Sequence, residues 1–232
     1  MATVIREIVS KDLLKTTIQA IDGEIGVLGD IYFDDSTWGI RYLVVDTSKW
    51  LPGRKVLIPP HALTSSEPIA QHVPLNLTKD QIRNSPDASS DQPVSLREEM
   101  ELRAYYAWPP IAAASITPGP VIGSDYTFAA LVPPPAVNAE EAEDHDPHLR
   151  SLSQELLGCQ IETRDGEFGH IEDVTLDLRS GRLISIVIDT SRGRGGYKVV
   201  VPVSAITEIR LSGKVRLRAY REDIENAPLF FE

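Results

Sequence analysis

The sequence is poor in features that would place it outside the cytoplasm. It holds one cysteine, Cys159, which excludes an internal disulfide and a cysteine-based metal site and fits a reducing compartment. No apolar run approaches the roughly 18 residues that span a bilayer, and residues 1–7 lack the apolar core of a signal peptide. We therefore expect a cytoplasmic protein that does not insert directly into a membrane.

Basic residues are also in deficit. The chain has 23 lysines and arginines against 34 aspartates and glutamates, which gives a formal net charge of −11. A field of this sign repels nucleic acid and anionic lipid at long range. The charge balance argues against a nucleic-acid partner and favours a protein partner or a cationic one.

The sequence contains one segment twice. Residues 10–63 reappear without a gap at residues 153–206, at a constant offset of 143. The identical positions include turn glycines, a proline and an acidic tripeptide: Ser10/Ser153, Asp22/Asp165, Gly23/Gly166, Asp30/Asp173, Asp34/Asp177, Asp46/Asp189, Thr47/Thr190, Ser48/Ser191 and Pro59/Pro202. This register predicts two copies of one small module. We assign residues 1–86 to the first copy, 87–147 to a linker and 148–232 to the second copy.

The pattern of apolar residues and turn residues in each copy predicts about five or six short strands. An Asp-Gly pair, Asp22-Gly23 or Asp165-Gly166, indicates the first hairpin turn, because glycine adopts the positive φ of a tight turn. The second strand shifts face near its middle, as a β-bulge would require, and the third (residues 40–45 and 183–188) is apolar almost throughout. We predict a mainly all-β fold of two tandem small barrels, closed or nearly closed, with a short helix in the linker.

The linker helix is predicted over about residues 95–107. Ser95 and Glu98 form a capping-box pattern at its start, and prolines follow its end. Its aromatic end, with Tyr105, Tyr106 and Trp108, either anchors the helix on a barrel or contacts a protein partner. The rest of the linker has the composition of an extended, acidic connection.

Several motifs resemble those of the PRC-barrel family when taken in order. They are the "DGEIG" and "DGEFG" turns, the strands ending "VVDTS" and "VIDTS", the loop "KWLPGRKVLIP", the closing Asn-x-Pro, the segment "YYAWPP" and the "HLRS" at residues 148–151. The resemblance covers residues 7–86 and 148–228. It implies two tandem β-barrel interaction modules with no common catalytic site. We expect no cofactor. The family includes the cytoplasmic domain of the photosynthetic reaction-centre H subunit and the C-terminal domain of a ribosome maturation factor.

The first expected function is therefore a non-enzymatic adaptor that binds other macromolecules and also self-associates. A second hypothesis, by analogy with the H subunit, is an accessory protein related to the photosynthetic reaction centre. A third is a small-ligand protein or an aspartic-protease-like enzyme in which Asp46 and Asp189 share a proton. Ser48 and Ser191 argue against the protease, since that family has glycine after the threonine.

The copies differ in the loop after the third strand. In the first copy this loop carries Trp50 and Leu51, a candidate protein contact because a tryptophan in a proline-bearing loop loses little entropy on binding. In the second copy the same loop carries Arg192 and Arg194 among glycines, a candidate anion contact.

Two metal hypotheses complete the set. One places a hard cation at Asp30, Asp34 and Asp35, and the other uses His145 and His148 with the neighbouring aspartates. Solvated acids and an inert linker account for both patterns equally well, so we expect no metal.

Overall fold

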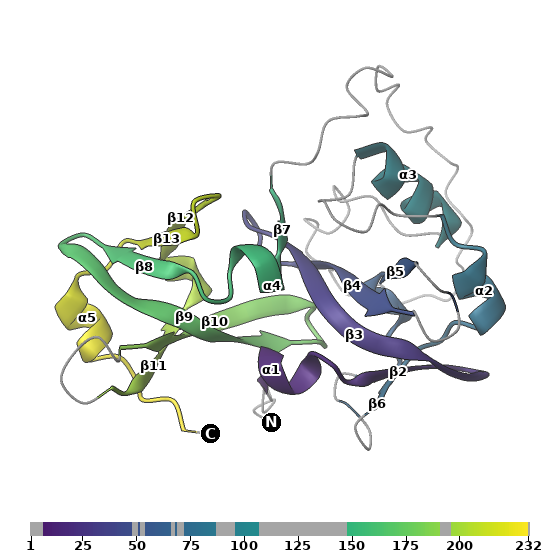
Figure 1. Ribbon diagram of the computed structural model, residues 1–232, viewed down its shortest axis with the longest axis horizontal. Coiled ribbons are helices and arrows are strands. Elements are labelled where there is room, and N and C mark those ends of the chain that lie inside the picture. Colours follow the sequence, from purple (N-terminus) through teal and green to yellow (C-terminus); the bar gives the residue numbers. More distant parts are fainter. Residues whose placement is uncertain are drawn as a thin grey trace, which may run out of the picture.

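The duplication in the sequence becomes two equivalent β-sheets in the computed structural model, one from each copy (Figure 1). The structure describes residues 7–47, 51, 54–65, 68, 72–86, 96–106, 148–190 and 196–231. The fold is mainly β, with two tandem barrel-type domains, as predicted. In the described residues neither sheet closes on itself.

The first sheet has the strand order β5-β4-β3-β2-β6. Neighbouring strands are antiparallel, except that β2 and β6 are parallel. Its strands are β2 (Thr17–Ala20), β3 (Gly23–Asp34), β4 (Ile40–Asp46), β5 (Lys55–Ile58) and β6 (His72–Pro74).

The second sheet repeats this plan in the order β11-β10-β9-β8-β13-β12. The second copy adds the hairpin of β12 and β13 where the first copy has only β6. The strands are β8 (Gln160–Thr163), β9 (Gly166–Asp177), β10 (Arg182–Asp189), β11 (Lys198–Pro202), β12 (Ile206–Arg210) and β13 (Lys214–Leu217).

The predicted bulge occurs at the same place in both copies. The pairing of β3 with β4 slips between Leu28 and Asp30, and that of β9 with β10 slips between Val187 and Ile188. The extra residue is Gly29 in one copy and Glu172 in the other, which are equivalent positions. The bulge explains why the apolar alternation changes face along each strand.

The two copies exchange their first segments, which the sequence did not predict. Strand β1 (Ile8–Val9) and helix α1 (Ser10–Leu13) of the first copy pack on β9, while β7 (Leu149–Ser151) and helix α4 (Leu152–Glu155) of the second copy pack on β3. Each exchange ends on a buried aspartate. The Ser10 hydroxyl donates to Asp173, and the Ser151 hydroxyl donates to Asp30 over 2.6 Å.

The exchange makes one continuous apolar core from both copies. Members of this core include Leu13, Ile31 and Phe33 of the first copy and Leu152, Leu176 and Ile186 of the second. A bridge between Gly39 and Arg182 joins the two sheets near the centre. The copies are therefore packed as a pseudo-symmetric pair, because each uses the same surface on the other.

Short helices end the repeated units. They are α2 (Lys79–Arg83) and α5 (Arg221–Glu225), with the short 3-10 helices Pro60–Ala62 and Val203–Ala205 before them. Helix α2 begins with a capping box between Thr78 and Gln81.

The linker helix is α3 (Leu96–Tyr105), close to the predicted residues 95–107. It lies beside the first sheet (Figure 1) and contributes to a second, smaller apolar cluster on the outer side of β3, β4 and β5. Each helix in the described part of the chain is too short or too polar to cross a bilayer.

Candidate functional site

The first sheet has an apolar outer face, directed away from the shared core. It consists of Tyr32, Tyr42, Val44 and Leu57, which alternate along β3, β4 and β5 with core residues and are each at most 7% exposed. Tyr32 faces Tyr42 across the strands, and Val44 faces Leu57. We call this set the first outer face. Four adjacent apolar side chains on a sheet surface require a cover, since an apolar patch of this kind otherwise remains in water.

Helix α3 provides that cover. Its Leu102 is 1% exposed, and Tyr106, just past its end, packs against the same cluster. Full burial of a leucine side chain contributes about 2 kcal/mol. Burial raises the pKa of Tyr106 to about 12 and also raises the pKa of Tyr42, where the Glu99 carboxylate adds to the effect.

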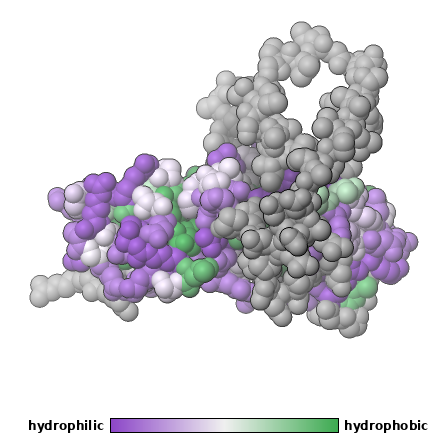
Figure 2. All heavy atoms as spheres, turned by 90° about the horizontal axis from the view of Figure 1, so that it is seen from above, coloured by the Kyte–Doolittle hydropathy of each residue, from purple (hydrophilic) through white to green (hydrophobic). Residues whose placement is uncertain are grey.

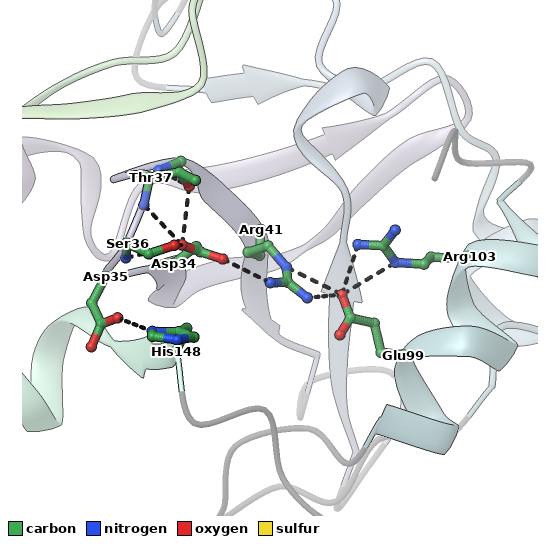
Figure 3. A network of polar contacts seen from close by, with 9 residues as sticks. Asp34, Asp35, Ser36, Thr37, Arg41, Glu99, Arg103 and His148 are labelled. Atoms are coloured by element: carbon green, nitrogen blue, oxygen red, sulfur yellow. Dashed lines mark hydrogen bonds and ion pairs between the residues drawn. The ribbon is translucent and has the colours of Figure 1, made fainter. Parts of the chain in front are cut away.

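A buried ion network fixes the orientation of α3 (Figure 3). Arg41 on β4 donates to Asp34 over 3.1 Å and, through Nε, to Glu99 over 3.1 Å. Arg103 donates to the same Glu99 oxygen over 2.9 Å. Glu99 is 1% exposed and Arg41 is 7% exposed, so the two cations and two anions balance where water cannot screen them.

The turn after β3 holds the far end of this network. Burial by itself would raise the pKa of Asp34, but hydrogen bonds from Ser36 and Thr37 outweigh it and lower that pKa below its ordinary value. The Ser36 and Thr37 N–H groups donate to Asp34 over 3.0 and 2.9 Å. Asp34 is thus ionised and ready to pair with Arg41.

The second sheet has an equivalent outer face, and its residues are smaller. Thr175, Ser185, Val187 and Val200 stand where the first copy has Tyr32, Tyr42, Val44 and Leu57. We call this set the second outer face. In the described residues no helix equivalent to α3 lies on it. The duplication therefore provides one face with a bound helix and one without.

A groove of about 530 Å³ opens on the second outer face. Thr175, Val187 and Val200 line it, together with Val9 from the exchanged segment. Thr175 is 4% exposed, and its Oγ1 has no hydrogen-bond partner in the described part of the chain. A buried hydroxyl without a partner costs about 1–3 kcal/mol, so this atom is suited to a ligand that hydrogen-bonds to it.

The C-terminal residues form one wall of the groove. The N–H of Phe230 donates to the Lys198 carbonyl over 2.9 Å, and Leu229 bridges to Val199, so this segment runs along the outer edge of β11. Phe230 and Phe231 line the groove, and Phe231 is 80% exposed. The C-terminal residues lie on the lower side of the molecule in Figure 1, and the opposite side, which Figure 2 shows from above, is mainly hydrophilic over the second sheet with small apolar patches.

Two of the predicted protein-contact residues lie at the end of α3 and a third lies in the loop after β4. Tyr106 is engaged with the first outer face, and Tyr105 donates its hydroxyl to the Gln81 carbonyl over 2.7 Å while remaining 40% exposed. These contacts support the anchoring interpretation of the aromatic cluster. Leu51 is half-buried in a turn in which its N–H donates to the Thr47 carbonyl over 2.9 Å. Trp50 and Trp108 lie outside the described residues, as do Arg192 and Arg194.

Asp46 and Asp189 do not form a catalytic pair. Gly39 and Arg182 bridge in antiparallel fashion, so β4 and β10 leave this bridge in opposite directions. Each aspartate lies seven residues farther along, or about 23 Å of strand. The shared proton of the aspartic-protease hypothesis requires hydrogen-bond distance, and that version of the hypothesis is wrong.

The three aspartates of the first metal hypothesis already have partners within the protein. Asp30 accepts from Ser151, Asp34 accepts from Arg41, and Asp35 accepts from Arg150 over 2.9 Å. For the second hypothesis, Nδ1 of His148 lies 2.7 Å from Asp35, and His145 lies outside the described residues.

One further group has metal-ligand types. His170, Glu172 and Asp189 offer ligand atoms within 4.8 Å of one another. Lys11 and Lys198 both pair with Glu172, and the hydrogen bond from Lys11 lowers the pKa of that carboxyl more than any other contact. Glu172 thus already pairs with two ammonium groups, which a metal dication at this carboxylate would have to displace.

Sequence reasoning missed the two outer faces. The signal that could have found them is the set of differences between the copies within the strands, such as Tyr32 against Thr175 and Arg41 against Ile184. Differences between loops usually carry function, but here the informative differences lie within the strands.

The arrangement contains two barrel-type sheets, a cis-bound helix on one and a groove on the other. No curated protein matches the chain. The family model for the PRC-barrel domain matches residues 6–82 and again residues 150–217, which together are more than half of the chain. Apart from the exchanged first strands, each matched segment holds the strands of one sheet. The chain belongs to the PRC-barrel domain family, of which it carries two copies in tandem.

Proposed function

We propose that this chain is a non-enzymatic, cytoplasmic interaction protein whose barrels bind protein segments through their outer sheet faces. The observation that carries the proposal is the binding of α3 to the first outer face. There the barrel holds an amphipathic helix by one apolar stripe and one buried ion network. The second outer face has the same strands and a groove, so it is the surface we assign to a partner.

The proposal is tested by site-specific photo-crosslinking from the full-length chain in a lysate of the source organism. A photo-reactive phenylalanine analogue replaces Phe231, which is 80% exposed at the groove, and in a control chain it replaces Leu211, which is 86% exposed at the turn between β12 and β13. Both substitutions alter exposed apolar residues, so neither disturbs the core.

We expect a discrete crosslinked protein from position 231 and none from position 211. Crosslinks that are absent from both positions, or equal at both, would contradict the use of the second outer face. The variant Trp50→Ala/Leu51→Ala, tested in the same way, shows whether the loop after β4 forms part of the contact, and a crosslinked product of twice the chain mass would support self-association.

A further inference from the structure

Two substitutions between the copies lie in the lining of the groove. Thr175 stands where the first outer face has Tyr32, and Val200 stands where it has Leu57. Ser185, which pairs with Thr175, is also smaller than its counterpart Tyr42 but is not part of the lining. One phenol ring is therefore absent from the lining of an otherwise equivalent surface. The groove, of about 530 Å³, has room for a large side chain of a partner. Such a side chain would restore the close packing that is usual in protein interiors.

The groove also contains a polar group, the Thr175 hydroxyl, that is buried and lacks a hydrogen-bond partner in the described residues. A wholly apolar occupant would leave it unsatisfied, whereas a tyrosine places a hydroxyl at the tip of an apolar ring. The ring of a tyrosine would therefore fill the groove, and its hydroxyl would hydrogen-bond to Thr175.

The rim of the groove has excess negative charge. Glu7 and Asp12 line it, and neither makes an ion pair within the part of the chain that the structure describes. Glu172, which also lines it, is balanced by Lys11 and Lys198. An occupant with lysine or arginine beside its apolar side complements this rim, and the net charge of −11 attracts it at long range.

Taken with the proposed function, on which this inference rests, the geometry points to one class of partner. We propose that the groove on the second outer face binds a basic amphipathic helix of another protein, with a tyrosine of that helix inserted against Thr175. Helix α3 provides the precedent on the first outer face, where Leu102 and Tyr106 are inserted and charged residues flank them.

The test uses a phage-displayed library of random peptides of about 15 residues, the length at which an isolated helix becomes marginally stable. The bait is the tagged full chain. Enriched peptides are synthesised, and their affinities are measured by fluorescence anisotropy for the wild type and for Thr175→Tyr. This variant fills the hollow with the residue that the first copy has at the equivalent position, Tyr32. Thr207→Tyr, at an exposed position on β12, is the matched control.

We expect enriched peptides to carry a tyrosine and a net positive charge. Thr175→Tyr should weaken their binding at least about 10-fold and Thr207→Tyr less than about 2-fold. The rim variant Glu7→Lys/Asp12→Lys changes only surface charge and should weaken binding about 10-fold, with the difference lost near 1 M salt, where the Debye length is about 3 Å.

Three results would overturn the inference. They are no enrichment above the bare support, enriched peptides without tyrosine or positive charge, and equal affinity for wild type and Thr175→Tyr. A dimer of the wild type that Thr175→Tyr dissociates in sedimentation would assign the groove to a second copy instead. If crosslinking from position 231 still finds a partner while the peptides fail, the proposed function stands and only the partner class is wrong.

Discussion

The buried ion network predicts how firmly α3 is held. In Arg41→Met the side chain keeps its length and loses its charge, which leaves Asp34 and Glu99 without the cation between them. The side chains of Arg41 and Glu99 are 8% and 2% exposed, so solvent offers little compensation. Breaking a buried pair costs about 3–5 kcal/mol, and Arg103 remains beside Glu99, so we expect about 3 kcal/mol.

Hydrogen exchange of residues 96–106, measured by mass spectrometry under native conditions, reports this cost directly. A loss of about 3 kcal/mol should accelerate exchange in α3 roughly 100-fold. The double variant Arg41→Met/Glu99→Leu also removes the buried Glu99 carboxylate, and we expect it to regain about 2 kcal/mol. Asp34 then loses Arg41 but keeps its hydrogen bonds from Ser36 and Thr37, and Arg103 loses Glu99 at a side chain that is 16% exposed.

The control is Arg216→Met on the second sheet. Arg216 pairs with Glu162 and Glu208, but its side chain is 44% exposed. An exposed pair contributes less than about 1 kcal/mol, so α3 exchange and global stability should hardly change. The reasoning is refuted if Arg41→Met leaves α3 exchange within about 3-fold of wild type, or if the double variant exchanges faster than the single one.

Three further predictions follow from the same structure. Burial raises the pKa of Tyr42 and Tyr106, so the unfolded chain loses these two protons at a lower pH than the folded chain does. The free energy of unfolding should therefore fall as the pH rises above about 10. An absorbance titration in which all seven tyrosines ionise together would contradict this. The pKa of Asp34 is lowered, so its contribution to the free energy of unfolding is present above about pH 3.8 and is lost as the pH falls further. Asp34→Asn should therefore flatten the acid side of a plot of the urea unfolding midpoint against pH. An unchanged slope would count against the network. Gly169→Ala should lower the free energy of unfolding in urea by about 3 kcal/mol, and Gly213→Ala by about 1 kcal/mol. Both glycines have positive φ, but only the first substitution would place Cβ 2.5 Å from the Asp189 carbonyl oxygen. Equal losses of stability would exclude the clash.

The repeated strands could be predicted from the sequence because their signals are local. Asp22-Gly23 and Asp165-Gly166 indicate hairpins through the φ that glycine permits, and the change of face along β3 and β9 indicates a bulge. The helix at residues 96–105 followed from its capping pattern and the prolines beyond it. Each of these inferences uses residues that lie within one turn or one strand of each other.

The exchange of first segments could not be predicted in this way. Ser10, Asp30 and Asp173 are repeated residues, and identical copies do not reveal whether a serine contacts the aspartate of its own copy or of the other. Glu99 and Arg41 have charges that normally indicate solvent exposure, and only the packing of α3 on the sheet reveals their burial. Predicting the groove from the sequence requires knowing which strand residues face outward. The bulge changes the outward-facing set midway along each strand, so the alternation of residues alone does not reveal it.

The exchanged segments also set an order of events during synthesis. Ser10 leaves the ribosome well before its partner Asp173, which lies 163 residues later. At about 5–20 residues per second, Ser10 waits about 8–33 s for this contact. Until then β3 of the first copy lacks its neighbour β7, and β1 has no strand to join. An unpaired strand edge is a site of aggregation, so the nascent first copy is the stage at which this protein most needs a chaperone.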